Sequence, residues 1–452
     1  MLICLTAIRG GKKIRSNTSF TTKEKKMSEI TENPRGGCVL SGIRAVLCAI
    51  DQVCPIYHSG PGCAFQSSAA TEGHGGKCEA LFYPARAIPT TAMLEKEVVF
   101  GGTKKLRTTI QGAISLFDAD AYFVLTGCTA GINGDDIESV VKEFQHIQPV
   151  YAIKTAGFEG NDMLGYEVVF DTFIDQIIEK KERQANLVNL LGIVPYHDPY
   201  WSGTIEEITR ILNKLGLEVN NFFTAGQGIE SVRNAGNAAA NIIVHPWLLR
   251  GAEKRFEEKF GIPSIRVEGM PVGPTASSDF VRQVGTSLFL DKELVEKVIA
   301  EEEEYVYRYY EQAIGKLSWK RFAVVGDSNY GIGLTRFLAN DYGFSPVLTV
   351  ISEPVFRPKD KEVIERRLHD LEYAKAPKIL FKSDQFDISN AISQAEDLSL
   401  LVGSSSEKEI AEEIGIQCIP VTFPVPDRVI FNRTYAGYKG SLTLVEDLYD
   451  NL

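Results

Sequence analysis

Three short segments of this chain share one local pattern, in which a cysteine follows a glycine-containing turn and stands directly before a stretch that can form a helix. The segments are Arg35-Gly36-Gly37-Cys38, Ser59-Gly60-Pro61-Gly62-Cys63 and Leu125-Thr126-Gly127-Cys128. The first turn of a helix offers free N–H groups and the positive end of the helix dipole, and both favour a thiolate or an anionic cluster. We therefore expect the chemistry of this chain to centre on these three sulfur atoms.

Iron–sulfur clusters take cysteine thiolates as ligands, usually four of them. Cys38, Cys63 and Cys128 supply three, so we interpret them as ligands of a cluster whose remaining ligands come from a second chain. Their spacing is wide and contains no Cys-x-x-Cys pair. A second interpretation, that of three buried core thiols, therefore stays open on the residues alone. Cys78 follows two glycines and is a candidate for approaching the same site.

The composition excludes several classes of protein. The chain has 452 residues, 44% of them hydrophobic and 24% charged, and a net charge of −11. These values are typical of a soluble globular protein and argue against nucleic acid or a lipid surface as the main partner. No apolar run is long enough to span a membrane, and no convincing secretory signal is present. Eight cysteines are too few for a disulfide scaffold, and Cys48, Cys54 and Cys418 lie in apolar stretches typical of a core. We expect a cytoplasmic protein, in which unpaired cysteines indicate metal binding or catalysis.

Strand-like apolar runs alternate with helical patterns along most of the chain, which predicts an α/β fold with parallel sheets. Residues 1–27 are basic and polar and predict a disordered arm, with Met27 a candidate start. We expect three α/β domains after the arm, of which the first carries the three cysteines. The predicted domains are 28–185, 186–318 and 319–452.

Several predicted elements bear on the site. A buried strand over 121–125 ends just before Cys128, which places this cysteine outside the carboxyl end of a parallel strand, where ligands of such sheets bind. Asp135 is predicted as the N-cap of a helix over 137–141. Other predicted elements are strands over 190–194 and 321–326, a helix over 229–239, and a long acidic connecting helix over 294–314.

Other motifs have less demanding explanations. A glycine-containing turn at Gly326, Gly331 and Gly333 follows a strand and opens a helix, and Glu353 ends the next strand. This is only a partial dinucleotide signature, because Gly331-x-Gly333 is followed by Arg336 where the signature has its third glycine. Tight packing of strand and helix explains the same glycines. His197 could relay protons or could simply lie in a surface loop, and His245 is predicted to be structural. Because no cysteine lies between Cys128 and Cys418, we do not expect a second thiolate-bound metal site in the middle of the chain.

The ordered motifs of this chain resemble those of the nitrogenase component 1 superfamily, and specifically its beta-type chains. The resemblance covers about residues 30–452. The motifs that carry it are Cys38-x-Leu-x-Gly, His58-Ser-Gly-Pro-Gly-Cys63, Val99-Phe100-Gly101-Gly102, Cys128-x5-Gly134-Asp135-Asp136, Val244-His245-Pro246-Trp247, Gly326-Asp327, Gly403-Ser404, Phe423-Pro424-Val425-Pro426-Asp427-Arg428 and Tyr435-Ala436-Gly437-Tyr438-Lys439-Gly440.

The resemblance implies an oxidoreductase subunit with three Rossmann-like domains, each a parallel sheet flanked by helices. It also implies an alpha2-beta2 heterotetramer in which an alpha-type chain shares an iron–sulfur centre, 8Fe-7S (P-cluster-like) or 4Fe-4S, with this one. Cys38, Cys63 and Cys128 would be the ligands from this chain. Electrons would come from an ATP-dependent iron protein and pass to an active site in the partner, so no catalytic residue is expected here.

The sequence also departs from the family pattern. The cysteine of the middle domain and the histidine near the C-terminus that hold the cofactor of alpha-type chains are absent, and so is a long N-terminal extension. Gly157, in Thr155-Ala156-Gly157-Phe158, stands where beta chains of molybdenum nitrogenase have a serine near the cluster. Without the alpha-type ligands, this chain is not expected to hold such a cofactor in that way. Gly157 and the missing extension favour a nitrogenase-like reductase, with relatives that reduce carbon–sulfur bonds or tetrapyrroles. The alternatives are a scaffold chain for cofactor assembly and a nucleotide-dependent oxidoreductase that uses the Gly326 turn.

Overall fold

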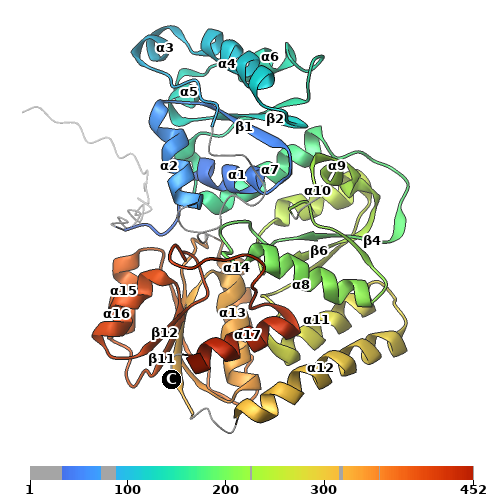
Figure 1. Cartoon of the computed structure of the whole chain (residues 1–452), viewed down its shortest axis with the longest axis vertical. Coiled ribbons are helices and arrows are strands. Elements are labelled where there is room, and N and C mark those ends of the chain that lie inside the picture. The colour runs from blue at the N-terminus through green and yellow to red at the C-terminus, as the bar shows by residue number, and fades with distance from the viewer. Residues whose placement is uncertain (1–32, 73–87, 224–226, 315–318, 356, 451–452) are drawn as a thin grey trace, which may run out of the picture. The chain divides into compact units, whose positions relative to one another are not determined.

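The computed structural model describes residues 33–72, 88–223, 227–314, 319–355 and 357–450 (Figure 1). The predicted arm and Cys78 lie outside these residues. The described residues form three sheets, and every strand pairing within them is parallel. Helices flank the sheets, which confirms the predicted α/β fold class.

The first sheet holds the strands β1 (Val53–His58), β2 (Ala121–Thr126) and β3 (Val150–Ile153), in that order. Helices cover both of its faces (Figure 1). One face carries α4 (Thr103–Leu116) and α6 (Ile137–Lys142), and the other carries α1 (Val39–Cys48) and α7 (Asp162–Gln176). The shorter helices are α2 (Pro61–Glu72), α3 (Glu95–Phe100) and α5 (Cys128–Asn133).

Helices α1 and α7 cross so closely that glycine is required at the contact. A Cβ atom on Gly42 would lie 1.8 Å from the Asp162 backbone oxygen, and one on Gly165 would lie 2.5 Å from the Ile43 nitrogen. All ten residues of α1 are buried. This crossing fixes the start of α1, where Cys38 lies, beside the start of α7.

The second sheet has the order β5 (Glu218–Asn220), β4 (Gln184–Leu191), β6 (Ala238–Val244) and β7 (Ser264–Val267). Its helices are α8 (Trp201–Lys214), α9 (Ile229–Arg233), α10 (Arg250–Phe260) and α11 (Gly273–Ser287). The long helix α12 (Lys292–Ile314) follows, as the sequence predicts for 294–314.

The third sheet has the order β10 (Lys378–Phe381), β9 (Ser345–Ile351), β8 (Arg321–Gly326), β11 (Leu400–Gly403) and β12 (Gln417–Pro420). Its helices are α13 (Ser328–Arg336), α14 (Pro358–His369), α15 (Gln385–Ser393), α16 (Lys408–Glu413) and the C-terminal α17 (Gly437–Asp450). Residues 32–452 form one compact unit, and one hydrophobic core includes residues from all three sheets. The domain borders at 185/186 and 318/319 therefore stay predictions.

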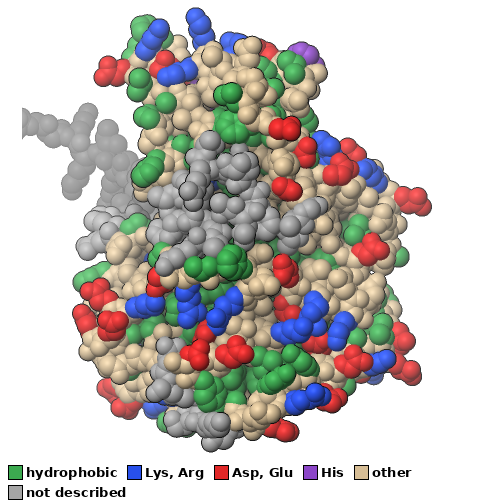
Figure 2. Space-filling view, in the orientation of Figure 1, with side chains coloured by type: hydrophobic (Ala, Val, Ile, Leu, Met, Phe, Trp, Pro, Cys, Tyr) green, Lys and Arg blue, Asp and Glu red, His purple; other side chains and the backbone are tan. Residues whose placement is uncertain are grey.

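Two predicted elements have wrong borders. The strand predicted over 190–194 is β4, which ends at Leu191 because Gly192 turns the chain with a φ of 92°. The helix predicted over 229–239 ends at Arg233, and β6 begins at Ala238 after a short turn. Within that turn, Gly236 packs directly on the backbone oxygen of Glu179. Among the described residues, no helix is long and apolar enough to cross a membrane. On the face drawn in Figure 2, acidic and basic side chains are interspersed.

Candidate functional site

The three predicted cysteines all lie at helix N-termini. Cys38 directly precedes α1, Cys63 lies in the first turn of α2, and Cys128 is the first residue of α5. None of these three helices carries an acidic residue in its first turn. The positive end of each helix dipole is therefore available to a thiolate or an anionic group.

The sulfurs of two of these cysteines converge on Gly157, which begins a short turn (Gly157–Glu159) before α7. A Cβ atom on Gly157 would lie 3.0 Å from Cys128 Sγ and 3.2 Å from Cys38 Sγ. The two sulfurs are therefore separated by no more than the sum of these distances, although they are 90 residues apart in sequence. A side chain at Gly157 would occupy the space that both sulfurs face.

The sulfur of Cys63 belongs to the same group. Burial raises the pKa of the Cys63 thiol, a hydrogen bond to Ser59 partly offsets this, and the charges of Cys128 and Cys38 raise the pKa further. Cys63 thus lies within electrostatic reach of the other two cysteines.

The three-cysteine group is open to a surface rather than enclosed. Cys38 is exposed, and Cys63 and Cys128 are half-buried. Within the described ranges, no three His, Cys, Asp or Glu side chains are arranged to hold a single metal ion. The core assignment of Cys48 and Cys54 is confirmed, because they are 4% and 0% exposed.

Asp135, which was predicted as the N-cap of α6, has a different role. The N-cap of α6 is Asp136, whose side chain accepts a hydrogen bond from Ser139 N at 3.1 Å, and the prediction of Asp135 was wrong. Asp135 instead accepts the N–H of Gly102 at 3.0 Å and lies 2.9 Å from His58 Nε2. It therefore ties the end of β1 to the glycines that follow α3.

Helix α3 presents an exposed apolar surface. Val99 and Phe100 are 71% and 83% exposed, and Leu94 and Val98 are exposed beside them. We call these four residues the α3 patch. Two more exposed side chains lie near the site in sequence: Phe65 is two residues after Cys63, and Phe158 follows Gly157. Large apolar side chains that gather on an exposed surface indicate contact with other proteins.

The glycine turn after β8 is used for packing. A Cβ on Gly326 would lie 2.5 Å from Thr422 Cγ2, and one on Gly333 would lie 2.4 Å from the Met270 backbone oxygen. The Asp327 carboxylate caps α13 and accepts N–H groups that a phosphate would need. Packing and capping thus account for this turn, and the nucleotide interpretation has no support from its geometry.

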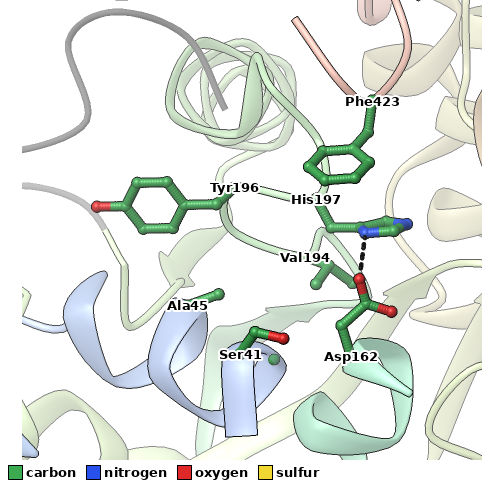
Figure 3. Close-up of a pocket in the computed structure, with 8 residues that line it drawn as sticks. Ser41, Ala45, Asp162, Val194, Tyr196, His197 and Phe423 are labelled. Atoms are coloured by element: carbon green, nitrogen blue, oxygen red, sulfur yellow. Dashed lines mark ion pairs between the residues drawn. The ribbon is translucent and has the colours of Figure 1, made fainter. Parts of the chain in front are cut away.

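His197 is not a surface-loop residue. Its side chain is only 17% exposed, its ring stacks on Phe423 with 4.8 Å between ring centroids, and its Nδ1 lies 3.5 Å from Asp162 Oδ2 (Figure 3). Asp162 also accepts the N–H of Gly37 at 3.3 Å, directly before Cys38. Sequence reasoning missed Asp162, because its only local signal is its position at the start of a helix.

Comparisons with known proteins agree over nearly the whole chain. The sequence pattern of the family described as nitrogenase component 1 type oxidoreductase matches residues 38–452. The chain is 24% identical to the nitrogenase molybdenum-iron protein beta chain of Methanococcus maripaludis, over 93% of this chain and 94% of that protein. It is 26% identical to the nitrogenase iron-molybdenum cofactor biosynthesis protein NifE of Clostridium pasteurianum, over 91% of this chain and 86% of that protein.

A solved structure has the same fold. The structure titled "Nitrogenase Cp1 at pH 6.5" superposes with a TM-score of 0.78 at 22% sequence identity, and the match covers 94% of each chain.

Proposed function

Because the chain belongs to the family of nitrogenase component 1 type oxidoreductases, we propose that it is the beta-type subunit of a nitrogenase-like reductase. In this proposal it forms a cytoplasmic alpha2-beta2 heterotetramer with an alpha-type chain. Cys38, Cys63 and Cys128 are its ligands to an iron–sulfur centre, 8Fe-7S or 4Fe-4S, that the two chains share. The observation that carries the proposal is the convergence of cysteine sulfurs from separate helix N-termini on the bare face of Gly157.

The cluster, when bound, accepts and passes on single electrons. The residues of this chain supply the thiolates, direct three helix N-termini at them, and keep the space beside Gly157 free of side chains. Helix dipoles and neighbouring N–H groups stabilise the reduced, more negative state and so set its potential. Because three thiolates are one short of the usual four, the open side of the group supports completion by the partner chain.

The exposed apolar surfaces support two protein partners. Phe65 and Phe158 adjoin the cysteine group and suit a permanent contact with the alpha-type chain. The α3 patch, with Phe100 the most exposed of its four side chains, suits transient docking of an ATP-dependent iron protein.

The test is to purify the chain anaerobically with its partner and to follow the centre by EPR. We expect cluster iron in the complex and its reduction by the iron protein only when ATP is supplied. An iron-free complex, or a reduction that does not depend on ATP, would overturn the proposal.

The likeness to NifE supports a second candidate, a scaffold on which a metal cofactor is assembled. Both candidates predict iron in the complex, so substrate turnover separates them. A reductase is oxidised and reduced repeatedly in the presence of its substrate. A scaffold instead gives up a metal cluster to a recipient protein and loses iron as it does so.

A further inference from the structure

Six ionisable side chains lie where the second and third sheets present the carboxyl ends of their strands, and two of them, Asp162 and His197, are in contact at 3.5 Å. His197 and Asp198 follow β4, His245 follows β6, Asp327 follows β8 and Glu353 follows β9, and Asp162 joins them from the start of α7. We call these six residues the strand-end cluster. The carboxyl ends of parallel strands are the usual ligand position in such sheets. None of the six belongs to the cysteine group.

The strand-end cluster holds more carboxyl groups than cations. Asp198, Asp327 and Glu353 are 6%, 8% and 3% exposed, and no lysine or arginine is among the six. His245 accepts the N–H of Leu248 at 3.1 Å on its Nδ1, and burial holds its pKa well below the usual range, so it is neutral. Among the six, His197 is therefore the one cation beside four carboxyl groups, and Arg266 lies at the edge of the cluster, where it donates to the His245 backbone oxygen at 2.8 Å. Leaving three buried negative charges unbalanced is costly, and the cheaper arrangement keeps protons on some of the carboxyls.

Hydrogen bonds indicate which carboxyl is neutral. Asp327 accepts two N–H groups at the start of α13, and the helix dipole stabilises its anion. Glu353 accepts hydrogen bonds from Ser328 N at 3.0 Å, Trp247 Nε1 at 2.8 Å and the Ser328 hydroxyl, but all three go to Oε1. Among the residues that the structure describes, buried Oε2 has no hydrogen-bond partner. A proton on Glu353 Oε2 removes the negative charge from an oxygen that no donor stabilises.

We propose that the strand-end cluster is a buried proton store, in which Glu353 carries an exchangeable proton and the His197 imidazolium stabilises the carboxylate left when that proton departs. On release, the Oε2–H bond breaks, Glu353 becomes an anion, and His197 keeps its charge. The released proton is taken up by water. The cavity beside His197 and Asp162, with a volume of about 20 Å³, has room for one water molecule on the His197 side of the cluster (Figure 3).

The electrostatics are consistent with exchange near neutrality. Burial raises the pKa of Glu353 to about 7, and the charge of Asp327 adds to this effect while His197 opposes it. Burial opposes the charge of His197, but Asp162, and then Asp327 and Glu353, outweigh it and raise its pKa to about 9. The groups that face this pair are Asp162, Asp198, His245, Asp327 and the neutral Tyr330, and Arg266 on β7 faces His245. Burial also raises the pKa of Asp198 to about 7.

The store is connected to the cysteine group through Asp162, which contacts His197 on one side and the N–H before Cys38 on the other. The use of the store rests on the proposed function. An electron arriving at the centre adds negative charge, which favours one proton on Glu353, and oxidation releases it. Reductions consume protons with electrons, so this site can supply them beside the relay.

The experiment is infrared difference spectroscopy of the purified complex between about pH 5 and about pH 9, which spans the change in charge. We expect the carbonyl stretch of a protonated carboxyl to disappear as pH rises. Glu353→Gln, which copies the shape of the protonated acid, should lack the Glu353 part of this band. Asp198 and Asp341, whose pKa values burial raises to about 7 and about 6, should contribute the rest. Glu167→Gln, which removes a half-buried carboxyl on α7, should retain it.

A second variant covers the case in which Glu353→Gln does not fold. His197→Gln removes the cation that stabilises the Glu353 anion, so the midpoint of the band should move to higher pH. No titrating band in the unaltered complex, a band of unchanged intensity in Glu353→Gln, or a midpoint that stays in place in His197→Gln would overturn the proposal. Iron content is measured on the same sample. A band without iron supports the proton store and contradicts the proposed function. Iron without a band contradicts the proton store and supports the proposed function.

Discussion

Replacing Arg35 with methionine removes the buried cation that joins the Cys38 segment to the third sheet. Arg35 Nη1 lies 2.7 Å from Glu407 Oε1, and Nη2 donates to Ser404 Oγ at 2.9 Å and to the Phe423 backbone oxygen at 2.6 Å. The side chains of Arg35 and Glu407 are 5% and 0% exposed. Methionine fills similar volume but leaves the Glu407 charge buried and unpaired.

The magnitude follows from this burial. Removing one partner of a buried ion pair costs about 3–5 kcal/mol, because the other charge is left without compensation. Most of this loss should return in the double variant Arg35→Met/Glu407→Gln, which has no uncompensated charge. Arg107 pairs with Glu143 in a similar two-contact geometry at 2.6 Å, but both side chains are 45% exposed. Arg107→Met is the matched control and should leave stability almost unchanged.

Hydrogen exchange read by mass spectrometry is the suitable assay, because a chain with three sheets is not expected to unfold in one step. Peptides over 33–40 and 400–407 should exchange about a hundredfold faster or more in Arg35→Met, since each 1.4 kcal/mol is a factor of about ten. The reasoning is refuted if these peptides exchange less than about tenfold faster. An equal change in Arg107→Met would refute it as well.

Three further outcomes are expected. Gly157→Ala should lower the iron content of the complex, because the new Cβ would stand 3.0 Å and 3.2 Å from two ligand sulfurs, whereas Gly112→Ala, with no atom within 4 Å of its new Cβ, should keep full iron. The raised pKa of His197, about 9 against 6.5, contributes about 3 kcal/mol that is fully present below pH 6.5 and is lost as pH rises through 9, so His197→Gln should flatten the fall in melting temperature across that window. Phe100→Ser should weaken binding of the iron protein by about 2 kcal/mol in a titration without changing iron content; Leu116→Ser, at another exposed position, should not.

Local sequence patterns predict two kinds of element well: helices with one buried face, and short strands that are buried along their whole length. The strand expected over 321–326 is β8 (Arg321–Gly326), and the acidic helix expected over 294–314 is α12. Helix α7 was not predicted. Its buried side chains Met163, Tyr166, Val169, Phe170, Phe173 and Ile174 share one face of the helix. Leu164 and Val168 are also apolar but lie on the opposite side, and this weakens the amphipathic pattern in the sequence.

The candidate site is likewise predictable from the sequence only in part. The glycine turns place all three cysteines at helix starts, and that is a local feature which the sequence shows. Convergence on Gly157 depends on the crossing of α1 and α7, for which no local pattern exists. The strand-end cluster is further from prediction, because its members come from strands of two sheets that only tertiary packing brings together. Asp135 and Asp136 are adjacent and equally suited to cap a helix, so sequence could not assign their roles.

Iron and sulfide content of the anaerobically purified complex, compared among cysteine variants, tests the central claim most directly. We expect cluster iron and its EPR signal in the unaltered complex, and loss of both in Cys38→Ala, Cys63→Ala and Cys128→Ala. Cys48→Ala, which changes a buried thiol on α1, should keep both. A complex that retains its full iron after the three replacements are combined would contradict the account.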